Sequence, residues 1–308
     1  MRERVIKQFS LFSVLFFVSL GLYAQAKNDA FDFELEVLTK DDCRLCHIGQ
    51  AEAYFSSPHG HSENAMHENP IKQCETCHGE FYAHIKSQGE SLDGVVSFVT
   101  KNGTFLERNQ RCMNCHEDSR RMHWQGSMHE NSSMDCSSCH KIHDEDAVLA
   151  RNEESNVCFS CHQKIRADLH KPSSHPSGEV MSCRDCHNSH GSTGDKLLKH
   201  FDVNLVCYEC HANLRGPFLW EHPPASDNCL TCHEAHGSSH YSMLKRRAPF
   251  LCQQCHQNEV GSRHVRRVMD LDALAEVGEG RFIAAGSCMN CHSKVHGSNH
   301  PSGVGLSR

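Results

Sequence analysis

The pattern of apolar and polar residues along this chain predicts little regular structure. One long apolar run, FSLFSVLFFVSLGL at 9–22, follows a basic N-terminal segment and precedes the small-residue sequence Ala24-Gln25-Ala26. A basic segment, an apolar segment and a small-x-small site in this order are typical of a secretory signal peptide. We therefore expect 1–26 to be a cleaved signal peptide and the mature chain to be exported; an uncleaved membrane anchor is the alternative.

Beyond this run, only two short segments carry a periodic pattern. The sequence LDALAEV at 271–277 is amphipathic and predicts a short helix. The sequence VVSFVTKNGTFLE at 95–107 predicts a small hairpin around its Asn-Gly turn. Elsewhere Gly, Pro, Ser and Asn interrupt every candidate element, which indicates loops.

The composition does not supply an ordinary hydrophobic core. Hydrophobic residues, cysteine included, make up 38% of the chain and aromatic residues 7%. Burying so few apolar side chains does not offset the entropy lost by the chain on folding. The 20 cysteines and 27 histidines instead indicate disulfides, metals or a covalent cofactor. The formal net charge of −7 argues against nucleic acid as a partner.

All 20 cysteines belong to one motif, Cys-x-x-Cys-His, whose ten copies we number 1 to 10 in chain order. A disulfide framework or a zinc site with paired Cys-x-x-Cys motifs would also use many cysteines. Neither requires a histidine after the second cysteine, whereas c-type haem attachment does. The motif cysteines are Cys43, Cys46, Cys74, Cys77, Cys112, Cys115, Cys136, Cys139, Cys158, Cys161, Cys183, Cys186, Cys207, Cys210, Cys229, Cys232, Cys252, Cys255, Cys288 and Cys291.

The chemistry of c-type haem explains the spacing of the motif. The two thiols form thioethers with the vinyl groups of the porphyrin, and the adjacent histidine binds the iron as its proximal ligand. We therefore expect ten covalently bound haems, whose apolar macrocycles replace the missing side-chain core. The proximal histidines are His47, His78, His116, His140, His162, His187, His211, His233, His256 and His292.

The remaining histidines group the motifs into five two-motif modules. Each module has an internal histidine between its two motifs and a trailing histidine after the second motif. A trailing histidine is too close in sequence to its own proximal histidine to reach the opposite face of the same haem, so we expect it to bind a neighbouring haem. Modules 1 to 5 cover 41–84, 110–143, 157–191, 205–237 and 250–297.

If every iron carries two histidines, ten of the remaining histidines are distal ligands. In module 1 the internal histidine is His59, His61 or His67, and the repeat of Met-His-Glu-Asn at 66–69 and 128–131 favours His67. We expect His200, His240 and His300 not to be ligands. The other nine expected distal ligands are His84, His129, His143, His175, His190, His222, His236, His264 and His296.

The expected fold is a multihaem cytochrome c with little regular secondary structure. Short α-helices and loops would wrap an extended chain of ten haems. Four motifs fall in 27–150 and six in 151–308, which divides the mature chain into N-terminal and C-terminal haem modules.

Three functions are compatible with such a protein. An electron conduit needs irons with both axial positions filled. A multihaem enzyme, such as a nitrite or hydroxylamine oxidoreductase, needs an iron with an exchangeable position, which a motif ending in lysine would indicate. All ten motifs end in histidine, which favours the conduit and argues against a catalytic residue. A periplasmic electron store differs from the conduit only in its partners.

Several segments resemble the periplasmic decahaem c-type cytochromes of the MtrA/DmsE family. They are QCETCHG (73–79), HWQGSMHENSSMDCSSCHKIH (123–143), RGPFLWEHPPASDNCLTCHEAHGSSHYSMLKRRAPFLCQQCH (215–256) and HGSNHPSG (296–303). The similarity extends over nearly all of the mature chain and includes the number of motifs. It implies bis-histidine haems arranged as an extended conduit, a periplasmic location and association with the outer membrane.

The resemblance also implies partners and one ligand. The partners are an outer-membrane β-barrel porin of the MtrB type, a periplasmic or inner-membrane-anchored cytochrome, and a cell-surface cytochrome or terminal reductase used in extracellular anaerobic respiration. The SSPHG context favours His59 as the internal ligand of module 1, and we adopt His59 on this ground. Glu80-Phe81 stands where the family has Pro-Gly, close to His84.

Overall fold

The computed structural model describes residues 42–61, 70–100, 102–176, 178, 180–256 and 288–307. The signal peptide and the helix expected at 271–277 lie outside these ranges. The structure contains short helices, 3₁₀ turns and loops, as the sequence predicts, and the longest helix described, α7 (Phe105–His116), has 12 residues. None of the described helices has the length and apolar character needed to span a membrane.

The chain divides into two compact units. Unit 1 comprises residues up to Asn102 together with Ile142–Glu145, and unit 2 comprises Gly103–Lys141 and Asp146–Arg308. The division near residue 150 expected from the motif count stays a prediction. The helices of unit 1 are α2 (Asp42–Cys46), α3 (Ile48–Ser56), α4 (Pro58–His61), α5 (Pro70–His78) and α6 (Tyr82–Lys86).

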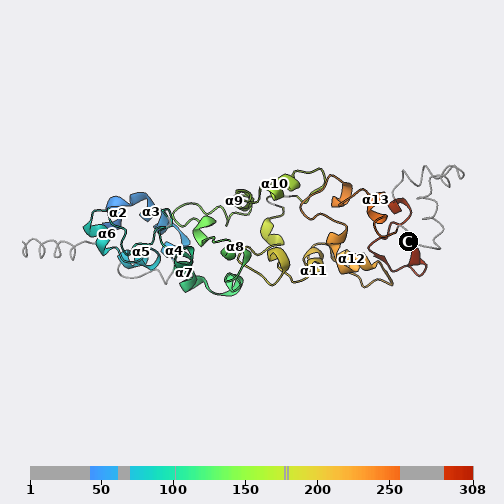
Figure 1. Ribbon diagram of the computed structural model, residues 1–308, viewed down its shortest axis with the longest axis horizontal. Coiled ribbons are helices and arrows are strands. Elements are labelled where there is room, and N and C mark those ends of the chain that lie inside the picture. The colour runs from blue at the N-terminus through green and yellow to red at the C-terminus, as the bar shows by residue number, and fades with distance from the viewer. Residues whose placement is uncertain are drawn as a thin grey trace, which may run out of the picture. The chain divides into compact units, whose positions relative to one another are not determined.

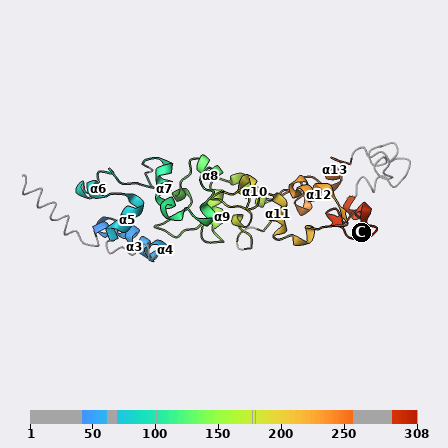
Figure 2. The ribbon, with the colours of Figure 1, turned by 90° about the horizontal axis from the view of Figure 1, so that it is seen from below.

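In unit 2 the two motifs of a module adopt different local structures. The first motif begins within or at the end of an α-helix, and the second begins with a 3₁₀ turn over its first three residues. Figure 1 labels the α-helices of this unit, and Figure 2 shows them from a second direction. They are α7, α8 (Met128–Asn131), α9 (Glu154–Phe159), α10 (Gln163–Leu169), α11 (Val203–Tyr208), α12 (Pro223–Asp227) and α13 (Ala248–Cys252). The 3₁₀ turns are η2 (Ser119–Arg121), η3 (Cys136–Ser138), η4 (Cys183–Asp185), η5 (Asp195–Leu197), η6 (Ala212–Leu214), η7 (Cys229–Thr231), η8 (Tyr241–Met243), η9 (Cys288–Asn290) and η10 (Gly303–Gly305).

Short backbone pairings connect successive modules of unit 2. Strand β1 (Trp220–Glu221) pairs antiparallel with β2 (Gly297–Ser298), with Trp220 opposite Ser298. An isolated bridge, also antiparallel, joins Ser173 to Ser238. Each pairing links the internal segment of one module to the residues that follow the trailing histidine of the next. The sheet therefore fixes the positions of histidines and does not form a layer of its own.

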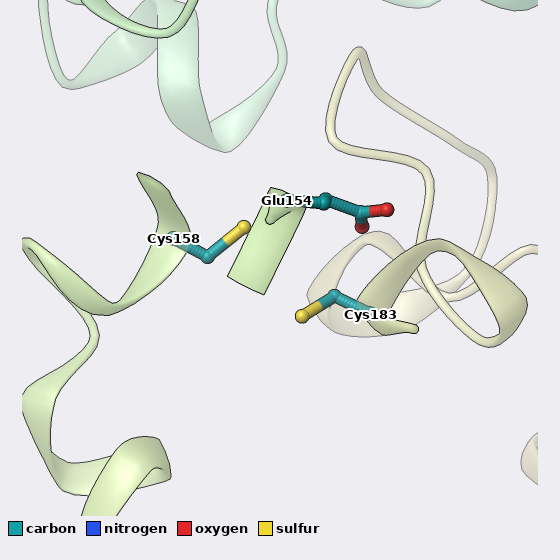
Figure 3. A group of neighbouring side chains, drawn as sticks. All are labelled: Glu154, Cys158 and Cys183. Atoms are coloured by element: carbon teal, nitrogen blue, oxygen red, sulfur yellow. The ribbon is translucent and has the colours of Figure 1, made fainter. Parts of the chain in front are cut away.

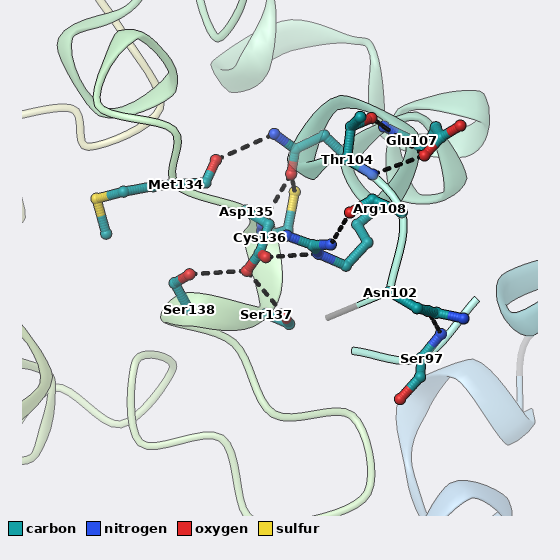
Figure 4. Close-up of polar contacts among 12 residues, drawn as sticks. Ser97, Asn102, Thr104, Glu107, Arg108, Met134, Asp135, Cys136, Ser137 and Ser138 are labelled. Carbon is teal, nitrogen blue, oxygen red and sulfur yellow. Dashed lines mark hydrogen bonds and ion pairs between the residues drawn. The ribbon is translucent and has the colours of Figure 1, made fainter. Parts of the chain in front are cut away.

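The hairpin expected at 95–107 is wrong. The Asn102 side chain closes the loop instead. Its Oδ1 accepts from the Ser97 N–H at 2.6 Å (Figure 4), and its Nδ2 donates to the Val95 carbonyl at 2.6 Å. Thr104 and Glu107 then form a capping box that starts α7. A Thr-x-x-Glu pair is a helix-start signal, and here it outweighs the strand propensity of the preceding residues.

The described residues bury few large apolar side chains. Trp124 and Val206 are the hydrophobic residues below a tenth exposed, whereas polar residues such as Asn109, Asp135 and Asn204 are buried. Removing a polar group from water costs free energy, so buried polar groups are nearly always hydrogen-bonded. The polypeptide is thus held by polar contacts around the motifs, as expected if the core is not made of side chains.

Candidate haem sites

Each Cys-x-x-Cys-His motif folds as one helical turn. The histidine N–H donates to the carbonyl of the first cysteine, at 2.8 Å for His47, 2.9 Å for His140 and 3.1 Å for His233. This turn brings both thiols and the imidazole close together. The three groups that c-type haem attachment requires are therefore positioned by local backbone structure alone.

The first cysteines of the two motifs in each module lie in side-chain contact. The Sγ atoms of Cys158 and Cys183 and a carboxylate oxygen of Glu154 all lie within 4.8 Å of one another (Figure 3). Because both thiols are thioether positions, we do not interpret this group as a separate metal site. The five contacts are Cys43 with Cys74, Cys112 with Cys136, Cys158 with Cys183, Cys207 with Cys229, and Cys252 with Cys288.

Buried asparagines hold these cysteine pairs in place in two modules. In module 4, Asn204 Oδ1 accepts from the Cys229 N–H at 2.7 Å, and its Nδ2 donates to two carbonyls of α12. In module 2, Asn109 accepts from the Cys136 N–H at 2.9 Å and donates to the Met134 carbonyl at 3.1 Å. Both asparagines stand three residues before the first cysteine of the module, a spacing that sequence reasoning missed.

Module 3 replaces the asparagine by an acidic side chain. Glu154 Oε1 accepts from the Arg184 N–H at 3.2 Å, and Glu154 forms an ion pair with the Arg184 guanidinium at 2.7 Å. Glu154 is 4% exposed, so its charge is compensated within the protein. We call the buried side chain that joins the two motifs of a module a clamp: Asn109 in module 2, Glu154 in module 3 and Asn204 in module 4.

Removal of the Asn204 clamp gives a first testable expectation. Asn204→Ala leaves the part-buried Cys229 N–H and two carbonyls without their Asn204 partner, so we expect a loss of about 1–3 kcal/mol in the free energy of unfolding. Guanidinium unfolding of the haem-loaded protein measures this loss. The exposed Asn213, replaced by alanine, serves as the control and should change stability by less than about 0.5 kcal/mol. Equal effects of the two variants would contradict the clamp.

The central feature of the sites is a set of imidazole pairs, each formed by two segments of the chain. In each pair one ring belongs to a motif histidine and the other to one of the remaining histidines, with ring centres 5.9–6.4 Å apart. The pairs are His47 with His84, His78 with His143, His162 with His129, His140 with His190, His211 with His175, His187 with His236, His256 with His222, and His233 with His296.

This separation fits a metal ion held between two imidazoles. With metal–nitrogen bonds of about 2 Å and about 1.2 Å from each nitrogen to its ring centre, the two ring centres lie about 6.4 Å apart. The rings of His140 and His190 are inclined by only 10°, with their centres 5.9 Å apart. The residues therefore fit haem iron with two axial histidines.

The pairing is reciprocal between successive modules. The internal histidine of one module faces the first proximal histidine of the next, as His175 faces His211. The trailing histidine of that next module faces back to the second proximal histidine of the earlier one, as His236 faces His187. Among the described residues, the three exchanges between modules 2 and 3, 3 and 4, and 4 and 5 follow this rule. Module 1 differs at its start, because its trailing residue His84 faces His47 of the same module.

In each of these three exchanges a hydrogen bond also joins the internal histidine to the segment that carries the trailing histidine. The Nδ1–H of the internal histidine donates to the carbonyl of the residue before the trailing histidine: His129 to Ser189 at 2.8 Å, His175 to Ala235 at 2.8 Å and His222 to Val295 at 2.9 Å. A proton fixed on Nδ1 leaves Nε2 as the lone-pair nitrogen that a metal requires.

A glycine follows the trailing histidine in modules 3, 4 and 5, where two chain segments approach closely. At Gly191 the backbone has φ +109°, and a Cβ atom would overlap the carbonyl of His123. At Gly237 a Cβ atom would overlap the carbonyl of Asp168. Only glycine combines this left-handed backbone with such a close approach.

The surroundings favour the neutral form of several paired imidazoles, among them His190, His187 and His236. Burial lowers the pKa of His190 to about 4, with a smaller contribution from the neighbouring His140. Burial is also the main cause of the lowered pKa values of His187 and His236. A neutral imidazole is the form that binds a metal ion, so desolvation favours the ligand state over the protonated state.

Several predicted residues stand apart from these pairs. His59 is exposed in α4, and His264 and His67 lie outside the described residues, so their assignments stay predictions. His61 Nδ1 is bonded to the Ser57 carbonyl at 2.9 Å.

The histidines that we expect not to be ligands have other surroundings. His200 Nε2 contacts Glu209 at 2.7 Å, and His300 Nδ1 contacts the Ser302 hydroxyl at 2.9 Å. His240 lines a polar cavity with Lys164, Asp168 and Lys245.

Comparison with known proteins decides the family. The sequence family described as "Doubled CXXCH motif" matches residues 175–216 and 222–261, and the family described as "Cytochrome c-type protein NrfB-like" matches 74–156. The chain is 44% identical over 273 residues to the multiheme cytochrome MtrA of Shewanella baltica (strain OS185), which covers 87% of this chain and 81% of that protein. The chain belongs to the MtrA family. This MtrA-family protein is a multihaem c-type cytochrome that binds haem covalently through its Cys-x-x-Cys-His motifs.

Proposed function

We propose that this MtrA-family cytochrome carries ten c-type haems and conducts electrons across the outer membrane within a porin–cytochrome complex. The observation that carries the proposal is the set of eight imidazole pairs, each built from two different motif segments. When bound, each haem supplies a one-electron site whose iron alternates between the ferric and ferrous states. The expected ligands of the remaining two irons are His59 and His264.

The ligand arrangement supports a carrier over an enzyme. A nitrite or hydroxylamine oxidoreductase needs an axial position that substrate can occupy. In the described part of the chain, eight proximal histidines face a second imidazole at the distance of a shared metal. These histidine pairs would hold the iron from both sides at the eight sites and leave no place on it for substrate.

The cysteines support passage along the chain. First cysteines are in contact within a module, and in modules 2 to 5 second cysteines of adjacent modules lie near each other, as Cys139 does to Cys161 and Cys232 to Cys255. Each cysteine sulfur would bond to the rim of its porphyrin. In modules 2 to 5 the chain thus brings consecutive attachment points together, alternately through first and second cysteines.

The family relationship supports the location and the partners. Membership of the MtrA family supports the proposal that this protein is periplasmic and enters an outer-membrane porin of the MtrB type. On one side it would exchange electrons with a periplasmic or inner-membrane-anchored cytochrome, and on the other with a cell-surface cytochrome or terminal reductase. This places the chain in extracellular anaerobic respiration.

Mass spectrometry and electron paramagnetic resonance test the haem sites. We expect a mass that corresponds to the mature chain with ten haems, and a ferric spectrum that contains only low-spin signals. Fewer than ten haems, or a large high-spin signal, would contradict the proposed ligand set and favour an enzyme.

Reconstitution tests the conduit. The cytochrome is co-inserted with an MtrB-type porin into liposomes that contain a reducible dye, and dithionite is added outside. We expect the dye to be reduced only when both proteins are present. Reduction by the porin alone, or none with the complex, would contradict a transmembrane conduit.

A further inference from the structure

The proximal histidines of the second motifs share a hydrogen-bonding rule with one exception. In modules 1, 3, 4 and 5 the Nδ1–H donates to a backbone carbonyl. The bonds are His78 to Val96 at 3.0 Å, His187 to Lys196 at 3.0 Å, His233 to Ser242 at 2.8 Å and His292 to Gly305 at 2.6 Å. In module 2 the acceptor is a carboxylate: His140 Nδ1 lies 2.8 Å from Asp146 Oδ2.

The local structure holds this carboxylate in place. The Asp146 side chain is 11% exposed and the His140 side chain 29% exposed. The other carboxylate oxygen accepts from the Val148 N–H at 3.3 Å, and the Asp146 carbonyl accepts from the Leu149 N–H at 2.9 Å. Within the described residues, no lysine or arginine forms an ion pair with Asp146, so its negative charge acts on His140.

We propose that Asp146 lowers the reduction potential of the haem attached at Cys136 and Cys139 relative to haems whose proximal histidine donates to a carbonyl. This inference rests on the proposed function, because it assumes that His140 and His190 hold iron between them. A carboxylate acceptor draws the Nδ1 proton more strongly than a carbonyl does and increases the electron donation of the imidazole to the metal. Greater donation and a nearby negative charge both stabilise ferric over ferrous iron, and second-shell hydrogen bonds are a recognised control of haem potential.

Asp146 is therefore a positioning and tuning residue, and it does not itself contact the iron. It makes one haem of the second module harder to reduce than its counterparts in modules 1, 3, 4 and 5.

The test compares Asp146→Asn with wild type by redox titration of the complete, haem-loaded protein. Asparagine keeps the size of the side chain and an acceptor oxygen but removes the charge. We expect a single one-electron component of the titration to move to a higher potential, while the haem count and the low-spin spectrum stay unchanged. Asp144→Asn is the matched control, because Asp144 is exposed, two residues away and of the same charge. Its titration curve should coincide with that of wild type.

The possible outcomes separate the inference from the proposed function. An unchanged curve in Asp146→Asn with ten haems present, or an equal shift in Asp144→Asn, would overturn the tuning role. Should Asp146→Asn lose a haem, Asp146→Ser is titrated as a second neutral variant. Loss of the haem from both variants would show a structural role instead. Failure of the ligand set itself would appear in wild type, as a high-spin signal or a haem count below ten.

Discussion

Replacement of His236 by alanine is expected to convert one low-spin haem into a high-spin one. His236 faces His187 with ring centres 6.1 Å apart, and it comes from the following module. Without it the iron at motif 6 loses its distal imidazole and gains an open position. We expect about one tenth of the ferric iron to give a high-spin signal, and the ferrous protein to bind about one carbon monoxide per chain, compared with nearly none in wild type.

His240→Ala is the matched control for this experiment. His240 lies four residues further along the same loop, but it lines a polar cavity and is not expected to be a ligand. This variant should remain low-spin and should not bind carbon monoxide. A low-spin spectrum in His236→Ala, or a high-spin signal in His240→Ala, would contradict the assignment of His236.

Replacement of Arg108 by methionine is expected to cause the largest loss of stability. Arg108 Nε lies 2.7 Å from Asp135 Oδ2, and the two side chains are 7% and 1% exposed. Asp135 also accepts from the hydroxyls of Ser137 and Ser138, so the carboxylate organises the start of motif 4 (Figure 4). Removal of one partner leaves a buried, uncompensated charge, which costs about 3–5 kcal/mol. Guanidinium unfolding followed by the Soret band measures the loss.

Two further variants test whether the loss comes from burial of the charge. Arg151→Met breaks an exposed ion pair with Asp185, whose side chains are 47% and 34% exposed, and should cost at most about 1 kcal/mol. Adding Asp135→Asn to Arg108→Met removes the unpaired charge and should restore part of the stability. Similar losses in Arg108→Met and Arg151→Met would show that burial of the pair does not matter.

The sequence predicts the haem attachment sites because their chemistry is local. Two thiols and an imidazole on one helical turn can be recognised from five residues. The paired motifs and their extra histidines also follow from spacing alone. The pairing between modules does not, because it depends on the path of the chain: His129 and the carbonyl of Ser189 are 60 residues apart in sequence.

Other features were hidden by the polar character of the chain. Asn109 and Asn204 resemble ordinary loop residues until the structure shows that each is 3% exposed and bonded to a motif cysteine. Asp146 lies in the acidic segment 144–146, which in sequence resembles a solvated surface run. The incorrect hairpin has a different cause, since the capping box of Thr104 and Glu107 was overlooked in a segment rich in β-branched residues.

The reciprocal exchange of histidines has a consequence for how such chains can change in length. In modules 3 and 4 one imidazole faces the next module and one faces the previous module. On the proposed ligand set, whole modules of this kind could be duplicated or deleted while every remaining iron keeps two ligands. Only the ends need special solutions, as His84 provides for His47 at the start of the chain. Evolution could thereby lengthen or shorten the haem chain in steps of two haems without changing any single site.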